Sequence, residues 1–376
     1  MATQQETLYA TALHHAGRFC PTPMTGLYRR LGSATAVMEH RRDIEGMFPN
    51  APKALVDALN DIDDSMAYAE EEMEFDMKHS IKPLLLNDDD YPQRLRACDD
   101  APMMLFSRGT ADLNAAHVVS IVGTRRATVY SRDVLKRFVA DLRQLCPDTI
   151  IVSGLAYGVD VTAHREALDN GLDTVGVLAH GLDTIYPAAH RDIATQMIRH
   201  GALLTEYMTH TKADKRNFVR RNRIVAGMCD ACILVESAAK GGGLITMEMA
   251  GNYNRELFAV PGSILTGASD GCNDLLRNNL ASMLTSAEDF IDTMGWNESH
   301  RLFEARNAGI ERQIFPELSD DERRIADELK ANGDEQLNII AARLAMPVHV
   351  VSATLFTMEM KGVVRMMAGN IYHLIL

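Results

Sequence analysis

Six short apolar runs in the middle of the chain constrain its fold more than any other feature. Each run is followed by a glycine-containing turn and then by a helix-like segment. The runs cover residues 118–122, 150–153, 174–179, 202–205, 232–236 and 257–260. Apolar runs with little polar alternation are typical of strands buried on both faces. They predict an α/β protein with a Rossmann-like core, a mostly parallel sheet covered by helices on both sides.

The carboxyl ends of these runs carry the residues best suited to hold a ligand. In an open parallel sheet, ligands bind beyond the carboxyl ends of the strands. Glycine there lets the backbone approach a ligand, and the following helix N-terminus offers free N–H groups, so we expect an anion such as phosphate. The candidate residues are Gly123, Thr124 and Arg125 after the first run, Ser153 and Gly154 after the second, and Lys240, Gly241 and Gly242 after the fifth.

A basic cluster lies close to this edge in the sequence. The net charge of −13 argues against a nucleic-acid partner, but residues 210–223 hold six lysines and arginines against one acid, Asp214. Arg221, Asn222 and Arg223 precede an apolar stretch, so we expect them at the start of a helix that points at the edge. Arginine there can form a fork with phosphate oxygens. The alternative is an ordinary solvated face of a charged helix.

The apolar spacing divides the chain into three parts and a linker. Residues 1–80 have helical spacing and predict a small helical domain, residues 81–296 form the core, and residues 297–317 predict a charged linker. Residues 318–376 predict three helices and a hairpin at Gly369-Asn370, which is a winged-helix pattern. This last part has eight acids and six bases, and its third helix has no lysine or arginine. We therefore expect it to contact protein rather than duplex DNA.

Several other kinds of protein lack support in the sequence. No G-x-G-x-x-G follows the first run and no G-x-x-x-x-G-K-[ST] occurs, so no dinucleotide or ATP cofactor is expected. No run reaches the roughly 18 apolar residues of a membrane span, and no signal peptide is evident, so a cytoplasmic protein is expected. Cys229 and Cys232 have no second pair, which favours packing over a metal site. Asp160 and His164 are either an acid/base pair or a capping aspartate and a buried histidine.

The motifs, taken in order, resemble the DNA-processing protein A family (DprA, also called Smf) from about residue 81 to residue 290. The resemblance rests on Asp90-Tyr91-Pro92, Gly123-Thr124-Arg125, Ser153-Gly154-Leu155-Ala156-Tyr157-Gly158-Val159-Asp160 with His164, Gly181-Leu182-Asp183, Tyr186-Pro187, Glu206, Phe218, Arg221-Asn222-Arg223, Val235-Glu236, Val260-Pro261-Gly262 and Gly271-Cys272-Asn273. The chain departs from the family pattern at Ser131, at Gly241-Gly242-Gly243 and at Asn279-Leu280. These departures affect the shape of loops and leave every arginine in place.

The resemblance implies a protein that is not an enzyme and needs no cofactor or metal. It implies binding of single-stranded DNA taken up in natural transformation, protection of that DNA, and loading of the RecA recombinase. It also implies a homodimer through the Rossmann-like domain and an N-terminal domain similar to SAM or helix-hairpin-helix modules. The family's DNA-binding positions correspond to Arg125, Arg221, Asn222, Arg223 and Lys240.

Two other hypotheses stay open at this point. Gly242, Gly243, Thr246 and Glu248 are similar to part of the PGGxGTxxE loop of nucleotide phosphoribohydrolases of the lysine-decarboxylase-like group, whose glutamate is catalytic. That loop requires a glycine where this chain has Ile245. A purely structural interaction module leaves the basic cluster unexplained. Binding to oligo-dT and release of adenine from AMP distinguish these hypotheses.

Overall fold

The computed structural model of the protein describes residues 3–296, 318–367 and 369–375. Contacts divide the chain into two compact units, Met1–Leu284 and Thr285–Leu376, which are described separately. The expected linker, 297–317, lies outside the described residues. The expected boundaries at residues 80 and 296 stay predictions, because the first unit contains both the N-terminal helices and the sheet.

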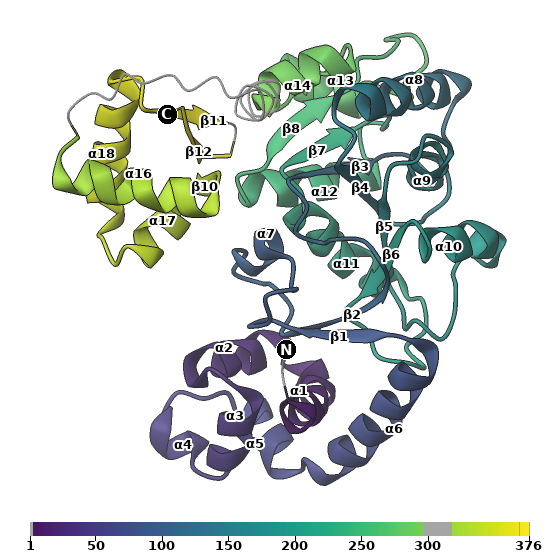
Figure 1. Ribbon diagram of the computed structural model, residues 1–376. Coiled ribbons are helices and arrows are strands. Elements are labelled where there is room, and N and C mark those ends of the chain that lie inside the picture. Colours follow the sequence, from purple (N-terminus) through teal and green to yellow (C-terminus); the bar gives the residue numbers. More distant parts are fainter. Residues whose placement is uncertain (1–2, 297–317, 368, 376) are drawn as a thin grey trace. The chain divides into compact units, whose positions relative to one another are not determined.

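A nine-stranded sheet forms the centre of the first unit (Figure 1). Its order is β1-β2-β6-β5-β4-β3-β7-β8-β9. All six predicted runs are confirmed as strands, and these six are parallel to one another. The antiparallel strands β1 and β2 extend one edge, and the short parallel strand β9 extends the other. The strands are β1 (Lys82–Leu85), β2 (Met104–Gly109), β3 (His117–Val122), β4 (Thr149–Ser153), β5 (Thr174–Val177), β6 (Gly201–Thr205), β7 (Ala231–Leu234), β8 (Glu256–Ala259) and β9 (Ser282–Met283).

The strand order reverses direction at β3. From β3 the chain proceeds to β4, β5 and β6 on one side and then returns to place β7 and β8 on the other. Ser120 of β3 pairs with Val152 of β4, and Val122 pairs with Leu234 of β7. In open α/β sheets a ligand crevice forms at such a reversal, beyond the carboxyl ends of the strands. The residues after β3, β4 and β7 are therefore placed where a ligand is expected.

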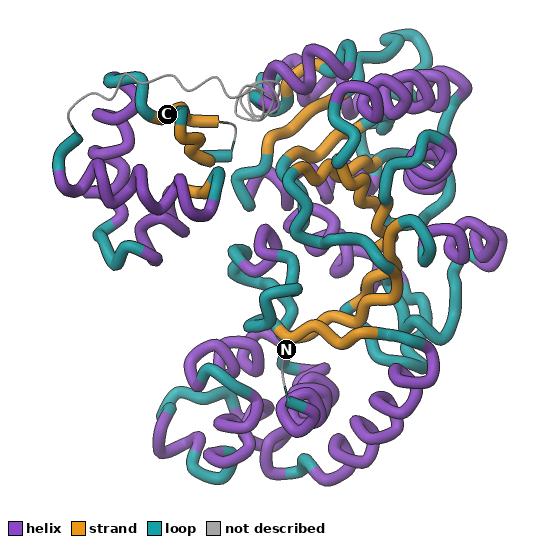
Figure 2. The backbone as a smooth tube through the Cα atoms, in the orientation of Figure 1, coloured by secondary structure: helices purple, strands orange, loops and turns teal. Residues whose placement is uncertain are grey.

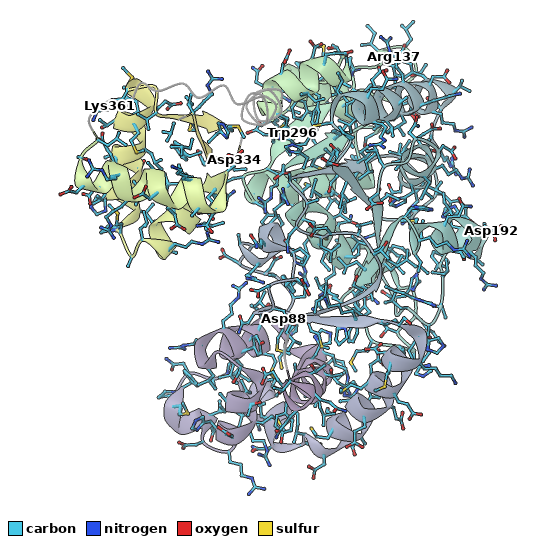
Figure 3. The ribbon with its side chains drawn as sticks, viewed as in Figure 1. Asp88, Arg137, Asp192, Trp296, Asp334 and Lys361 are labelled. Atoms are coloured by element: carbon cyan, nitrogen blue, oxygen red, sulfur yellow. The ribbon has the colours of Figure 1, made fainter. Side chains whose placement is uncertain are left out.

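Helices cover both faces of the sheet (Figure 2). One face carries α8 (Val129–Leu145), α9 (Val159–Asp169) and α10 (Arg191–Met197), and the other carries α11 (Lys215–Gly227) and α12 (Gly242–Asn252). Helix α8 illustrates why they pack this way, since its Leu135 and Leu142 are buried while Arg137 points away from the sheet (Figure 3). The short helices α7 (Gln93–Arg96) and α13 (Asp270–Arg277) complete this region.

The N-terminal helices share one hydrophobic core with the sheet. They are α1 (Gln4–Ala16), α2 (Pro21–Leu31), α3 (Ala34–His40), α4 (Ile44–Met47), α5 (Lys53–Asn60) and α6 (Asp63–His79), with a 3-10 turn, η1 (Gly17–Phe19), between α1 and α2. Polar contacts join them to the segment after β6. The Tyr68 hydroxyl donates to the Thr209 carbonyl (2.7 Å), and the Thr209 N–H donates to the Glu72 carboxylate (2.9 Å). The predicted helical nature of residues 1–80 is confirmed.

The second unit contains α14 (Ala287–Met294) and a winged helix. The winged helix comprises α16 (Asp320–Asn332), β10 (Glu335–Gln336), α17 (Leu337–Arg343), α18 (Val348–Met360), β11 (Val364–Met367) and β12 (Ile371–Leu374). Its small sheet has the order β10-β12-β11. A capping box between Ser319 and Glu322 fixes the start of α16. The predicted winged helix is thus confirmed.

Among the described residues, no single helix has both the length and the apolar character needed to cross a membrane. Helices α17 and α18 meet these two criteria only as a pair, with a bend of 116° between them.

Candidate functional site

The loops after β3, β4 and β7 meet at the carboxyl edge of the sheet. The Thr124 N–H donates to the Glu236 carbonyl (2.8 Å), and the Val159 N–H donates to the Thr124 carbonyl (3.1 Å). A Cβ atom on Gly243 would lie 3.3 Å from the Cα atom of Gly123. These contacts hold the three loops together, so the predicted edge is a single assembled surface.

Glu236 anchors the loop that carries Arg125. Its side chain is buried and accepts three hydrogen bonds, from the Thr128 N–H (2.9 Å), the Thr128 hydroxyl (2.8 Å) and the Ser131 hydroxyl (3.0 Å). Three donors compensate for removing the carboxylate from water. Ser131, a departure from the family pattern, is therefore an anchor in this protein. Sequence reasoning did not identify this role, although Glu236 stands within one of the motifs.

Gly158 allows the loop after β4 to approach the loop after β3. Its φ is +79°, and a Cβ atom there would lie 2.3 Å from the Thr124 carbonyl oxygen. A side chain at this position would combine an unfavourable backbone conformation with a collision. The position of Arg125, one residue beyond Thr124, thus depends on Gly158.

The exposed Arg125 and Tyr186 and the partly buried Phe218 form a cationic and aromatic patch at this edge. The guanidinium carbon of Arg125 lies 5.3 Å from the centre of the Phe218 ring, and the Tyr186 ring centre lies 5.7 Å from that of Phe218. Tyr157, in the loop after β4, and Tyr186 are each about half exposed. We name Arg125, Tyr157, Tyr186, Phe218 and Lys240 the strand-end surface. Within the described parts of the chain, no carboxylate forms an ion pair with Arg125 or Lys240.

The expected position of Arg221, Asn222 and Arg223 at a helix start is wrong. Helix α11 begins at Lys215, because the Asp214 side chain caps it by accepting from the Arg216 N–H (2.7 Å). The three residues therefore lie in the middle of the helix, at its seventh to ninth positions. Arg221 and Arg223 are 3% and 8% exposed and face the interior, so they do not point out at the edge.

Arg221 lies directly beneath the loop after β4. Its Nη1 donates to the carbonyl of Gly154 (2.6 Å) and to that of Val177. A Cβ atom on Gly154 would lie 2.4 Å from Nη2, so glycine is required to make room for the guanidinium. Burial lowers the pKa of Arg221, and the nearby Asp160 raises it. Burial likewise raises the pKa of Asp160, while Arg221 lowers it. The pair supports the strand-end surface from inside.

Arg223 and Asn222 also bind protein atoms. Arg223 donates to the Glu206 carboxylate (2.5 Å) and to the Asp100 carbonyl (2.7 Å). The Asn222 side-chain oxygen accepts from Nε of Arg221 (3.2 Å). The Arg223 contacts join α11 to Asp100 and to Glu206 after β6 and so fix the orientation of the helix, whereas the Asn222 contact lies within the helix.

Ser153, Asp160 and His164 lie inside the protein. The Ser153 hydroxyl donates to the Ile121 carbonyl (2.6 Å), and Nδ1 of His164 lies 2.7 Å from the Thr174 hydroxyl. His164 is fully buried, and burial lowers its pKa to about 3. Asp160 stands in the first turn of α9. Because neither group reaches solvent freely, the structure favours the structural reading of this pair over an acid/base pair.

The loop before α12 is open to solvent at two of its candidate residues. Lys240 and Gly242 are exposed, whereas a Cβ atom on Gly241 would lie 2.0 Å from the Ser237 hydroxyl oxygen. Gly241 therefore shapes the loop. Of the residues behind the enzyme hypothesis, Thr246 is buried and Glu248 is exposed on α12. All six cysteines are free and buried, Cys229 and Cys232 among them.

Comparison with known proteins agrees with this architecture. Residues 82–295 match the family DNA recombination-mediator protein A, and residues 312–370 match the DprA winged helix domain. The putative DNA processing protein DprA of Mycobacterium tuberculosis is 32% identical over 315 residues, which are 80% of this chain and 79% of the relative. The DNA processing protein DprA of Streptococcus pneumoniae is 38% identical over 204 residues, or 54% of this chain and 71% of the relative.

Two solved structures are also similar. The X-ray structure of DprA from Streptococcus pneumoniae has a TM-score of 0.66 and 31% identity, covering 76% of this chain and 97% of that one. The DNA processing protein A of Helicobacter pylori, described for its mode of binding single-stranded DNA, has a TM-score of 0.51 and 29% identity. It covers 57% of this chain and 94% of that one. From its family match, its relatives and its fold, the chain belongs to the DNA recombination-mediator protein A (DprA/Smf) family.

Proposed function

We propose that this protein binds single-stranded DNA across the strand-end surface. The observation that carries the proposal is the exposed Arg125 guanidinium over Phe218, beside Tyr186 and without a carboxylate partner among the described residues. Arginine neutralises phosphate, and aromatic rings stack bases of any identity, which is the combination used to bind single strands without sequence preference. The Helicobacter pylori relative binds single-stranded DNA, which supports the same role here.

The buried arginines have an indirect part in this proposal. Arg221 donates a hydrogen bond to the Gly154 carbonyl, and Arg223 donates one to the Glu206 carboxylate. Through these bonds both arginines support the strand-end surface. Direct contacts come from Arg125 and Lys240, with the backbone N–H group of Gly242 as a further candidate for phosphate binding, since the Thr124 N–H donates to the Glu236 carbonyl.

The test is fluorescence anisotropy with labelled oligo-dT over a range of salt concentrations. Arg125→Gln should weaken binding and reduce the slope of log K against log salt by about 0.7, the value for one phosphate contact on a single strand. Phe218→Leu should weaken binding by about 1 to 3 kcal/mol, the worth of one stacked base, without changing the slope. Arg137→Gln is the matched control, because Arg137 is an exposed arginine on the outer side of α8.

If Arg125→Gln and Phe218→Leu both bind oligo-dT as tightly as the parent at every salt concentration, the site is assigned to the wrong surface. If the unsubstituted protein releases adenine from AMP and does not bind oligo-dT, the phosphoribohydrolase hypothesis is supported instead.

We further propose that the protein protects incoming DNA and loads RecA during natural transformation. In this role it acts in the cytoplasm as a homodimer and is not an enzyme. Family membership supports it. The measurements are nuclease protection of oligo-dT, RecA filament formation on DNA coated with single-strand-binding protein, and sedimentation of residues 1–294. If the protein binds DNA but does not load RecA, the proposal of RecA loading is wrong and the proposal of DNA binding stands.

A further inference from the structure

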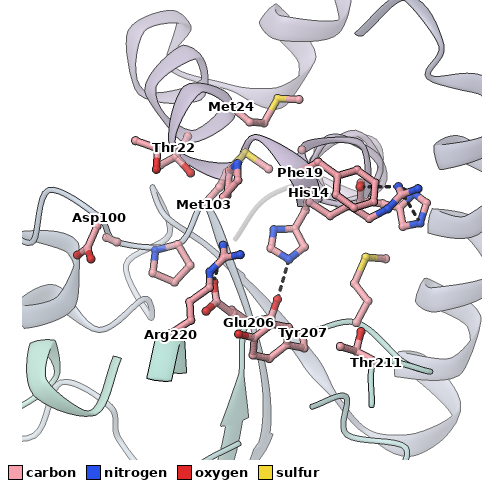
Figure 4. Close-up of a pocket in the computed structure, with 18 of the residues that line it drawn as sticks. His14, Phe19, Thr22, Met24, Asp100, Met103, Glu206, Tyr207, Thr211 and Arg220 are labelled. Atoms are coloured by element: carbon pink, nitrogen blue, oxygen red, sulfur yellow. Dashed lines mark hydrogen bonds and ion pairs between the residues drawn. The ribbon is translucent and has the colours of Figure 1, made fainter. Parts of the chain in front are cut away.

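A cavity of about 600 Å³ separates part of the N-terminal helices from the core of the first unit (Figure 4). Helices α1 and α2 with η1 line one side, and the segment after β6 with α11 lines the other. This volume lies within the range of small-molecule sites in proteins. None of the five residues of the strand-end surface lines the cavity, so it is a separate feature of the molecule.

Arg220 brings unused hydrogen-bond donors to the cavity. Glu206, whose carboxylate is buried, accepts a hydrogen bond from Arg223 (2.5 Å) and forms an ion pair with Arg220 (3.4 Å). One carboxylate therefore faces two guanidinium groups. Arg223 is also bonded to the Asp100 carbonyl, whereas the Arg220 side chain is 36% exposed and has no other acceptor among the described residues. Its remaining N–H groups and the excess positive charge suit an anion.

The other charges around the cavity do not cancel this excess. Four arginines and three acids line it. The acid Asp100 accepts from the Tyr253 hydroxyl (2.6 Å), and Arg29 donates to the backbone carbonyls of Cys98 and Asp99. Arg18 donates to the His15 carbonyl (2.9 Å) and lies over the Phe19 ring. Asp100 and Arg29 are thus occupied by the protein, and Arg220, beside Glu206, is the lining arginine that has no hydrogen bond to the protein among the described residues.

An acceptor and an apolar wall complete the cavity. Nε2 of His14 lies 2.7 Å from the Glu206 carbonyl, so this nitrogen carries the proton. Burial lowers the pKa of His14, which keeps the ring neutral and leaves Nδ1 as an acceptor. Phe19, Met24 and Met103 line the same cavity with apolar surface (Figure 4). The cavity thus combines a cation, an acceptor and apolar walls.

We infer that this cavity binds an organic anion of mononucleotide size. Its acidic group binds the Arg220 guanidinium, and its uncharged body lies among Phe19, Met24 and Met103. Because the ligand contacts α1 and α2 as well as α11, binding joins the N-terminal helices more firmly to the core. This inference is independent of the proposed DNA binding.

The test is isothermal titration of the full chain with four compounds. AMP carries a phosphate and a planar body, indole-3-acetate carries a carboxylate and a planar body, adenosine lacks the anion, and inorganic phosphate lacks the body. We expect AMP or indole-3-acetate to bind at least about tenfold more tightly than adenosine and inorganic phosphate, since only they use both halves of the cavity. Tighter binding of AMP would identify a phosphate ligand, and tighter binding of indole-3-acetate would identify a carboxylate ligand.

Variants then locate the binding. Arg220→Gln should weaken it by about tenfold or more, and Arg220→Lys should restore part of it. Gly26→Leu should also weaken binding, because Gly26 lines the cavity within α2 and a Cβ atom there meets nothing within 4 Å. Arg216→Gln, an exposed arginine of the same helix, and Arg125→Gln should leave it unchanged.

The inference is overturned if neither AMP nor indole-3-acetate binds at a few millimolar. It is also overturned if binding is insensitive to both Arg220→Gln and Gly26→Leu, or is abolished by Arg125→Gln, which would place the ligand on the strand-end surface.

Discussion

At the scale of single residues, the loop arginine Arg125 and the two helix arginines Arg221 and Arg223 have different roles. Arg125 is exposed, while Arg221 and Arg223 are enclosed by backbone carbonyls and carboxylates. A buried cation that loses its place leaves its partners unsatisfied, which is costly in a low-dielectric interior. Variants of these arginines should therefore separate binding from stability.

Arg221→Met should lower the free energy of unfolding by about 3 kcal/mol, because it leaves the Gly154 and Val177 carbonyls and Asp160 without their partner. Urea unfolding followed by circular dichroism measures this change. Arg216→Met, an exposed position of the same helix, should stay within about 0.5 kcal/mol of the parent. Parent-like stability for Arg221→Met would contradict the structural role given to this side chain.

Asp76 should make the protein less stable as the pH rises. Burial on α6, and then the nearby Glu72, raise its pKa from 3.8 to about 8. The folded state therefore holds a proton that the unfolded state releases above about pH 4, so stability falls between about pH 4 and pH 8. At about 1.4 kcal/mol per pH unit, this group lowers the free energy of unfolding of the parent by roughly 3 to 4 kcal/mol between pH 5 and pH 8, and Asp76→Asn, which removes the ionisable group, should not show this loss.

Urea unfolding at both pH values checks the Asp76 prediction. Glu74→Gln, an exposed acid on the same helix, is the control and should keep the pH dependence of the parent. An identical pH dependence in Asp76→Asn and the parent would show that this carboxyl does not titrate in the range.

At the scale of elements, the loops at the carboxyl edge depend on close backbone approach. Gly158 stands with φ +79° and ψ −122° between α9 and the loop that carries Arg125. Glycine alone adopts such a conformation without strain. The geometry of the strand-end surface is thus set by a residue that has no side chain.

Gly158→Ala should weaken oligo-dT binding by about tenfold and lower stability by more than about 2 kcal/mol, because it adds a collision with the Thr124 carbonyl to the backbone strain. Gly171→Ala is a matched control, since Gly171 has φ +72° but its Cβ atom would meet only Arg143, at 3.9 Å. It should cost about 1 kcal/mol of stability and leave binding unchanged. Equal effects of the two variants on binding would show that strain alone explains them.

At the scale of the whole molecule, the acidic net charge and the winged helix limit where DNA can bind. Helix α18, in the position of a recognition helix, exposes Val348, Phe356 and Met360 and has no lysine or arginine. A surface that meets a duplex needs cations, because these supply nearly all the non-specific affinity. The first unit, by contrast, holds the strand-end surface and its own hydrophobic core.

A chain that ends at Met294 should therefore bind oligo-dT within about threefold of the full chain. The full chain should bind duplex DNA with a dissociation constant above about 1 μM at physiological salt. Anisotropy with matched single-stranded and duplex probes measures both. A large loss of single-strand affinity on truncation would assign the winged helix a direct part in binding.

The sequence by itself determined the central sheet. Runs such as 118–122 and 150–153 are apolar throughout because both faces of each strand are covered, and this pattern needs no knowledge of distant residues. The glycine turns and the order of motifs located the edge that holds Gly123, Gly154 and Arg125. The winged helix followed from the helical spacing of the C-terminal part and from its hairpin turn.

Only the tertiary structure decided which charged groups face solvent. Arg220, Arg221 and Arg223 form one basic stretch in the sequence, yet their environments come from Glu206, Gly154 and Val177, which are distant in the chain. The local sequence does not predict whether an arginine will be buried, because a buried charge needs hydrogen bonds and ion pairs from residues of other elements. The cavity between α1, α2 and α11 arises in the same way, since its two sides are more than a hundred residues apart in sequence.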